Sequence, residues 1–142
     1  MAGVTRVPAR RVIGSHTLTT GFTTSATHTT AQDEGLTVSV TYGAARILRV
    51  SLFVHPYASG GAQTAVYTVL RNATVEMRVQ TPALVTGLVT SASHSRIFNG
   101  PATGATETFK VQIAAGTANT AVDSGGSASF VRQLVIEDLG PQ

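Results

Sequence analysis

The amino-acid sequence predicts an all-β fold, an antiparallel β-sandwich of the jelly-roll type. Runs of strand length alternate apolar with polar residues, which is the pattern of a strand that buries one face. Clusters of Gly, Pro, Ser, Thr and Asn separate these runs at intervals of roughly 8–14 residues, and no long window has helical spacing. Short strands spaced in this way are typical of a sandwich or a jelly roll.

The first half of the chain contains four predicted strands, over 36–42, 46–55, 66–70 and 75–80. In the first of them Leu36, Val38 and Val40 alternate with hydroxyl residues, so one face is expected to be buried. A three-residue link, Arg71-Asn72-Ala73, joins the last two strands. A link this short predicts a β-hairpin.

The second half contains four more predicted strands, over 84–89, 96–98, 109–113 and 129–139. Asn99-Gly100-Pro101 after the second of these is a strong turn signal. We expect one face of the last strand to lie in the core against the second strand of the chain. The predicted core residues are Phe130, Leu134 and Ile136 with Val50 and Leu52.

Charge divides the chain into two parts. The 142 residues include 10 Lys+Arg, 7 Asp+Glu and no Cys, which suits one domain without disulfides. Residues 1–32 hold three Arg and no acid, whereas the charges of residues 33–142 sum to zero. A basic segment rich in Thr and Ser cannot bury a core by itself. The sequence therefore predicts an extended N-terminal arm over 1–33 and a jelly-roll domain over 34–142.

Composition also excludes some classes of partner. The sequence pI is near 10.0, but residues 33–142 have no net charge, which argues against nucleic-acid binding. No apolar run approaches the roughly 20 residues that span a bilayer, and no signal-peptide core follows the N-terminal arginines. We expect a soluble protein that binds neither nucleic acid nor membrane and is not exported by a classical signal.

The residues that catalysis or metal binding would need form no recognisable pattern. The histidines lack the i, i+2 or i, i+4 spacing that places two imidazoles on one face, and no G-x-S-x-G motif is present. Glu137 and Asp138 are neighbours in a predicted strand, where successive side chains point to opposite faces, so they cannot share a proton. The sequence predicts no catalytic residue, no metal site and no cofactor. The histidines are His16, His28, His55 and His94.

Four segments together resemble a known family, the small jelly-roll virion proteins of tailed bacteriophages that infect actinobacteria. They are 36–42, 49–53, 109–113 and the closing Leu134-Val135-Ile136-Glu137-Asp138-Leu139-Gly140-Pro141. The family includes C-terminal modules of minor tail proteins, and related trimeric rolls similar to tumour-necrosis-factor folds occur as capsid decorations. The resemblance implies a homotrimeric jelly roll that is made in the host cytoplasm and incorporated into the virion.

Three functional hypotheses follow. The first is a non-enzymatic structural protein, an exterior capsid decoration (minor capsid or cement protein) of a tailed bacteriophage. The second is a minor tail protein that binds the host surface or a glycan there, although the predicted loops offer mainly Tyr57 as an aromatic platform. The third, a cell-wall hydrolase, needs a paired acid or metal site that the sequence does not contain.

Two kinds of contact are expected for the leading hypothesis. The arm is expected to attach the protein to a major capsid or tail protein, because its arginines can meet carboxylates there and its apolar residues can fill shallow grooves. The predicted attachment residues are Arg6, Arg10, Arg11, Val12, Ile13, Leu18 and Phe22. Self-association into a trimer is expected because Ile47 and Phe53 make the second face of the strand at 46–55 partly apolar as well.

Overall fold

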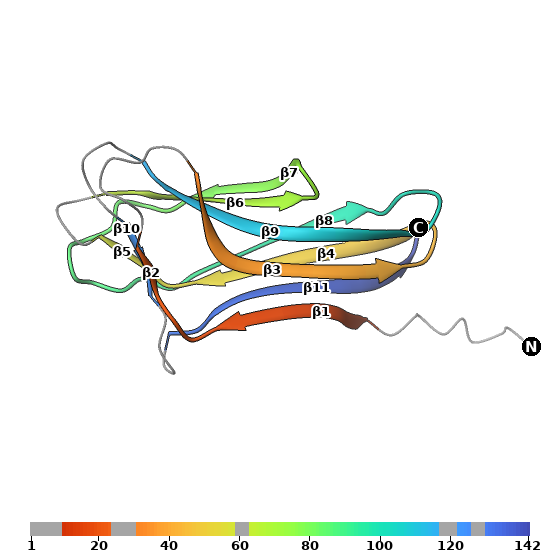
Figure 1. Cartoon of the computed structure of the whole chain (residues 1–142), viewed down its shortest axis with the longest axis horizontal. Helices are drawn as coiled ribbons and strands as arrows, with labels where there is room; N and C mark the ends of the chain where they lie inside the picture. The colour runs from red at the N-terminus through yellow and green to blue at the C-terminus, as the bar shows by residue number, and fades with distance from the viewer. Residues whose placement is uncertain (1–9, 24–30, 59–62, 117–121, 126–129) are drawn as a thin grey trace, which may run out of the picture.

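All regular secondary structure in the described residues is β. The computed structural model of the chain describes residues 10–23, 31–58, 63–116, 122–125 and 130–142. Figure 1 shows long strands running along one axis, with three short strands gathered at one end and the C-terminus at the other. The strands are β1 (Arg11–Leu18), β2 (Phe22–Thr23), β3 (Gln32–Tyr42), β4 (Arg46–Val54), β5 (Pro56–Ala58), β6 (Ala65–Arg71), β7 (Thr74–Gln80), β8 (Ala92–Asn99), β9 (Ala105–Ala115), β10 (Val122–Ser124) and β11 (Arg132–Pro141).

The long strands form a ribbon folded in half at the β6–β7 turn. Each strand of the first half pairs antiparallel with its counterpart in the second half: β1 with β11, β3 with β9, β4 with β8 and β6 with β7. The folded ribbon then wraps, so that β11 also pairs with β4 and β9 with β6. The result is two four-stranded sheets of order β1-β11-β4-β8 and β3-β9-β6-β7. This nested order of eight strands is a jelly roll, which confirms the predicted fold class.

The turn at which the ribbon folds is built by Asn72. Its φ of 55° lies in the left-handed region, which asparagine tolerates better than most residues. Its main-chain N–H donates to the Thr108 carbonyl at 2.7 Å, and its side-chain oxygen accepts from the Thr108 N–H at 3.0 Å. The short link therefore both turns the chain and binds the neighbouring β9 strand.

The core lies between the two sheets and consists of the inward residues of each alternating strand. Val50 and Leu52 of β4 and Leu134 and Ile136 of β11 are buried, as the sequence predicted. The opposite sheet contributes Leu36, Val38, Val40, Tyr67, Val69, Phe109, Val111 and Ile113. Burial of these side chains provides most of the stabilisation in a fold that has no disulfide.

Phe130 is an exception to the predicted core. It precedes β11 and is 41% exposed, and its ring makes an edge-on contact with the His55 ring at 5.4 Å between centroids. The sequence prediction began the alternating strand at residue 129, but the regular strand begins only at Arg132. The prediction that Phe130 belongs to the core was therefore wrong. The predicted strand 84–89 is also absent. Leu84 and Thr86 form only isolated bridges to neighbouring segments.

The boundary expected between arm and domain is also wrong. Residues 11–18, which the sequence assigned to the arm, form β1 and pair with β11 along its length. Ile13 and Leu18 pack against the core, so the sandwich begins before residue 34. Alternation did not reveal this strand because the register shifts between Val12 and Gly14, where a bulge displaces the apolar residues from a strict period of two.

Candidate interaction surfaces

Ion pairs occupy nearly all the acids of the chain. Six of its seven carboxylates, all those whose side chains the structure describes, lie within ion-pair distance of an Arg or Lys of the same chain. They are Asp33, Glu34, Glu76, Glu107, Glu137 and Asp138. Among the described cations, Arg11 and Arg78 form no such pair. These two arginines are therefore the cations of the described residues that are available to another molecule.

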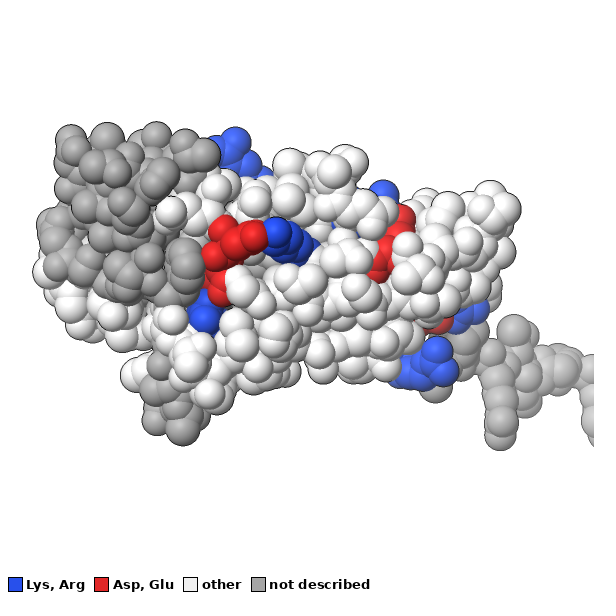
Figure 2. Space-filling model, viewed as in Figure 1, with Lys and Arg blue, Asp and Glu red and all other residues white. Residues whose placement is uncertain are grey.

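Arg11 belongs to a basic cluster at the end of the sandwich where β1 begins. Glu137 lies between two guanidinium groups, at 2.6 Å from Arg10 Nε and 2.5 Å from Arg49 Nη2. Asp138 pairs with Arg46 at 2.8 Å, which leaves the cluster of four arginines and two acids with a charge of +2. Figure 2 shows cationic side chains gathered at this end.

The two acids of this cluster, Glu137 and Asp138, bind different arginines. Burial alone would raise the pKa of Asp138, but hydrogen bonds from Arg46 and from the Gly140 N–H outweigh it. Together with the charges of Arg46 and Arg11, they hold the pKa of Asp138 below its usual 3.8. A hollow of about 360 Å³ beside it is lined by Arg11, Gly43, Arg46 and Asp138. The Arg11 charge therefore borders an open, polar recess.

The predicted attachment residues separate into three groups. Arg10 binds Glu137 of its own chain, and Ile13 and Leu18 pack against the core, so these three have intramolecular partners. Arg11 and Val12 are exposed, Val12 to 55%. Arg6 and the side chain of Phe22 lie outside the described residues, although the Phe22 backbone pairs with Ser124.

The face proposed for self-association is the outer face of the β1-β11-β4-β8 sheet. Phe53 on β4 is 39% exposed and Ile97 on β8 is 59% exposed, while Ile47 is half-buried. Phe53 is flanked across the sheet by Gln133 and Ser93, and Ile97 lies opposite Arg49. The apolar side chains of this face are therefore interspersed with polar ones.

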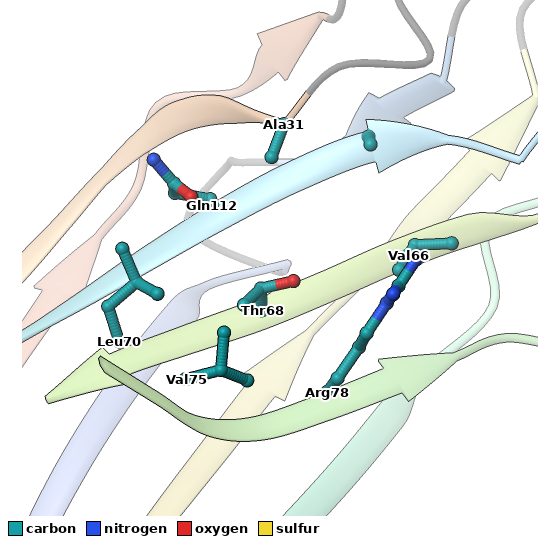
Figure 3. A pocket seen from close by; sticks show the side chains of 8 residues that line it. Ala31, Val66, Thr68, Leu70, Val75, Arg78 and Gln112 are labelled. Atoms are coloured by element: carbon teal, nitrogen blue, oxygen red, sulfur yellow. The ribbon is translucent and has the colours of Figure 1, made fainter. Parts of the chain in front are cut away.

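A second hollow lies on the outer face of the other sheet. It has a volume of about 290 Å³ and is lined by Ala31, Val66, Thr68, Leu70, Val75, Arg78, Gln112 and Ala114. We call it the β6–β7 groove. Figure 3 shows Leu70 and Val75 side by side at one end, with the Arg78 side chain extending from β7 towards Val66. Arg78 alternates with the apolar Met77 and Val79 along the sequence, a local pattern that could not show that β6 supplies apolar neighbours.

A buried polar cluster near the short strands supports the fold. Glu34 and Arg132 form an ion pair of 3.1 Å, and the carboxylate also accepts a hydrogen bond from Ser124, which in turn accepts one from Tyr67. Arg132 donates to the Thr20 carbonyl from Nε at 3.0 Å. Burial raises the pKa of Glu34, with the Ser124 and Arg132 interactions opposing the shift. The cluster joins β3, β6, β10 and β11 to the link after β1.

Neither a metal site nor a membrane span is found in the described part of the chain. No group of three or more His, Cys, Asp or Glu side chains there is arranged to hold a metal ion. His16 binds the main chain of Thr37, and His55 contacts Ser91 and Phe130. No helix that is both long and apolar enough to cross a bilayer occurs within the ranges that the structure describes.

Comparisons with known proteins found similar structures but no similar sequences. No family model and no curated protein sequence matches the chain. The structure of the infectious bursal disease virus Gx strain matches 96% of this chain and 43% of its own, with 12% identity and a TM-score of 0.46. The VP2 subviral particle of the same virus matches with 13% identity, 96% and 39% coverage and a TM-score of 0.45.

The same search matches a bacterial enzyme. The CBM22-1–GH10 modules of a Clostridium thermocellum xylanase match 91% of this chain and 29% of their own, with 13% identity and a TM-score of 0.40. The chain thus spans less than half the length of these three structures.

Proposed function

We propose that this chain is a non-enzymatic structural protein of a virion, an exterior capsid decoration of a tailed bacteriophage that is attached through its N-terminal end. The observation that carries the proposal is the basic cluster at the start of β1, with a charge of +2 and an Arg11 that has no described carboxylate within ion-pair distance. The resemblance of residues 134–141 to the closing strand of phage jelly-roll modules supports the same assignment.

The attachment surface that we propose is smaller than the sequence indicated. Arg11 and Val12 are exposed at the start of β1, and Arg6 adds a further positive charge to the segment that precedes it. A guanidinium group pairs most strongly with a carboxylate, so the attachment site on the capsid is expected to carry Asp or Glu. Ile13 and Leu18 are assigned to the core of the protein itself.

Self-association into a homotrimer is part of the proposal. The exposed Phe53 and Ile97 support a contact through the outer face of the β1-β11-β4-β8 sheet. Sedimentation equilibrium of the purified protein at micromolar concentration tests this: a mass of three chains supports it, and a single 14.6 kDa species contradicts it.

The attachment proposal is tested on purified particles of the phage that encodes the protein. Quantitative mass spectrometry is expected to find a copy number comparable with that of the major capsid protein. A protein lacking residues 1–9 and carrying Arg11→Gln is expected to fold and to leave the particles at lower salt, because screening acts on exposed charge pairs. Arg78→Gln changes the same charge in the other sheet and serves as the control.

Each alternative to the proposed attachment gives a different experimental result. Only a few copies per particle would assign the protein to the tail, in keeping with a minor tail protein that binds the host surface. Full occupancy by the altered protein at every salt concentration would show that the attachment site is elsewhere. Absence of the protein from purified particles would contradict a virion role.

A further inference from the structure

The β6–β7 groove contains the second unpaired cation of the described residues. Arg78 is exposed on β7 and forms no ion pair or hydrogen bond with another residue that the structure describes. Val75 on the same strand is 55% exposed, and Val66 and Leu70 of β6 are half-buried. β7 is also the last strand of its sheet, so its outer edge is free of a neighbouring strand in that sheet. Apolar side chains therefore surround a guanidinium group beside a sheet edge.

An unpaired arginine among apolar side chains indicates which kind of molecule would bind in the β6–β7 groove. Long arginine side chains lay their methylene groups on apolar surface and keep the charged end accessible. A carboxylate near the Arg78 guanidinium group would complete a charged hydrogen bond, and an aliphatic side chain next to that carboxylate would contact Val66, Leu70 or Val75. Thr68 and Gln112 provide polar groups within the groove.

The acids of a second copy whose side chains the structure describes are poorly placed to supply that carboxylate. All six described acidic side chains already have cationic partners. Withdrawing one of them would break at least one existing ion pair of the second copy, so the exchange would produce no net gain of ion pairs. Glu34 is fully buried and cannot reach another molecule at all.

We propose that the β6–β7 groove binds an extended segment of a different protein, one that carries a carboxylate next to an aliphatic side chain. The groove lies in the opposite sheet from Arg11, so this inference goes beyond the proposed attachment. Either can fail while the other holds.

The test uses a library of random linear heptapeptides, selected on the intact, immobilised protein. Synthetic copies of the enriched peptides are then titrated against the protein in solution. We expect Asp or Glu beside Val, Leu or Ile in the enriched sequences. Arg78→Gln is expected to weaken their binding about tenfold, the size of one charged hydrogen bond. Replacing the peptide's acid by its amide should weaken binding similarly, and combining both changes should cause little further loss.

Two measurements locate the binding. Methyl resonances of Val66, Leu70 and Val75 should shift on peptide addition, and the same addition to the Arg78→Gln protein should shift them less. Circular dichroism establishes that Arg78→Gln is folded. Enrichment of neutral or basic peptides, or equal affinity for the Arg78→Gln protein, would overturn the proposal. So would self-association that Arg78→Gln abolishes, because the occupant would then be a second copy.

Discussion

Gly14 of β1 lies against Val38 of β3, so closely that a Cβ atom at position 14 would be 2.6 Å from the Val38 Cγ1. The Val40 side chain is in similar contact with the same position. β1 and β3 belong to different sheets, and this contact closes the sandwich along one side. The glycine is needed here for its small size.

Gly14→Ala is therefore expected to lower the free energy of unfolding by about 1–3 kcal/mol, the usual range for overpacking a core. Thermal or urea unfolding followed by circular dichroism measures the change. Gly43→Ala is the matched control, since a Cβ there would meet nothing within 4 Å. Equal stabilities of the two variants would mean that β1 does not approach β3 this closely.

Leu52→Ala is expected to lower the free energy of unfolding by about 2–5 kcal/mol, because Leu52 is fully buried between the sheets and its truncation leaves a cavity. The adjacent Phe53 points away from the core and is 39% exposed. Phe53→Ala should therefore lower the free energy of unfolding of the monomer clearly less than Leu52→Ala does. A larger loss for Phe53→Ala would reverse the assignment of the two faces of β4.

Removal of residues 1–9 is expected to leave the melting temperature nearly unchanged, because the paired part of β1 begins at Arg11. Removal of residues 1–20 should destabilise the protein strongly, since it deletes β1 and the packing of Ile13 and Leu18 against the core. It also deletes the Thr20 carbonyl that accepts from the buried Arg132. If both truncated proteins melt alike, β1 does not contribute to the fold.

Acid should selectively remove the contribution of Asp138. Its pKa is lowered in the folded state, so its stabilising contribution is complete above the usual 3.8 and disappears as pH falls through the lower, folded-state value. Urea unfolding of the wild type and Asp138→Asn between about pH 2 and 6 measures this. The stability difference between them should narrow on acidification; a constant difference would contradict the lowered pKa.

Glu34 should show the opposite dependence. Burial raises its pKa above the usual 4.5 in the folded state, so its contribution favours folding most below pH 4.5 and decreases as pH rises through the folded-state value. Relative to wild type, Glu34→Gln should therefore become more stable as pH rises. A relative stability of Glu34→Gln that falls over this range would show that the Arg132 pair outweighs burial.

The sequence by itself determined the strands whose alternation is strict. In β4, over 36–42 of β3 and over 109–113 of β9, every second residue is apolar, so the two-residue period of the strand backbone matches the pattern of burial and identifies the buried faces. The Asn72 turn was likewise visible, because a short polar link between two strands allows few backbone paths. The resulting fold class, an antiparallel sandwich, needed no long-range information.

Tertiary structure decided what depends on contacts between distant segments. β1 escaped detection because a bulge breaks its alternation and its glycine faces the core, so its pairing with β11 could be recognised only across more than 110 residues of chain. The arginines looked alike in sequence. Only the folded ribbon brings Glu137 to Arg10 and Arg49, and Asp138 to Arg46, while leaving Arg11 and Arg78 unpaired. Charge pairing depends on distance in space, and a local pattern of residues does not contain that distance.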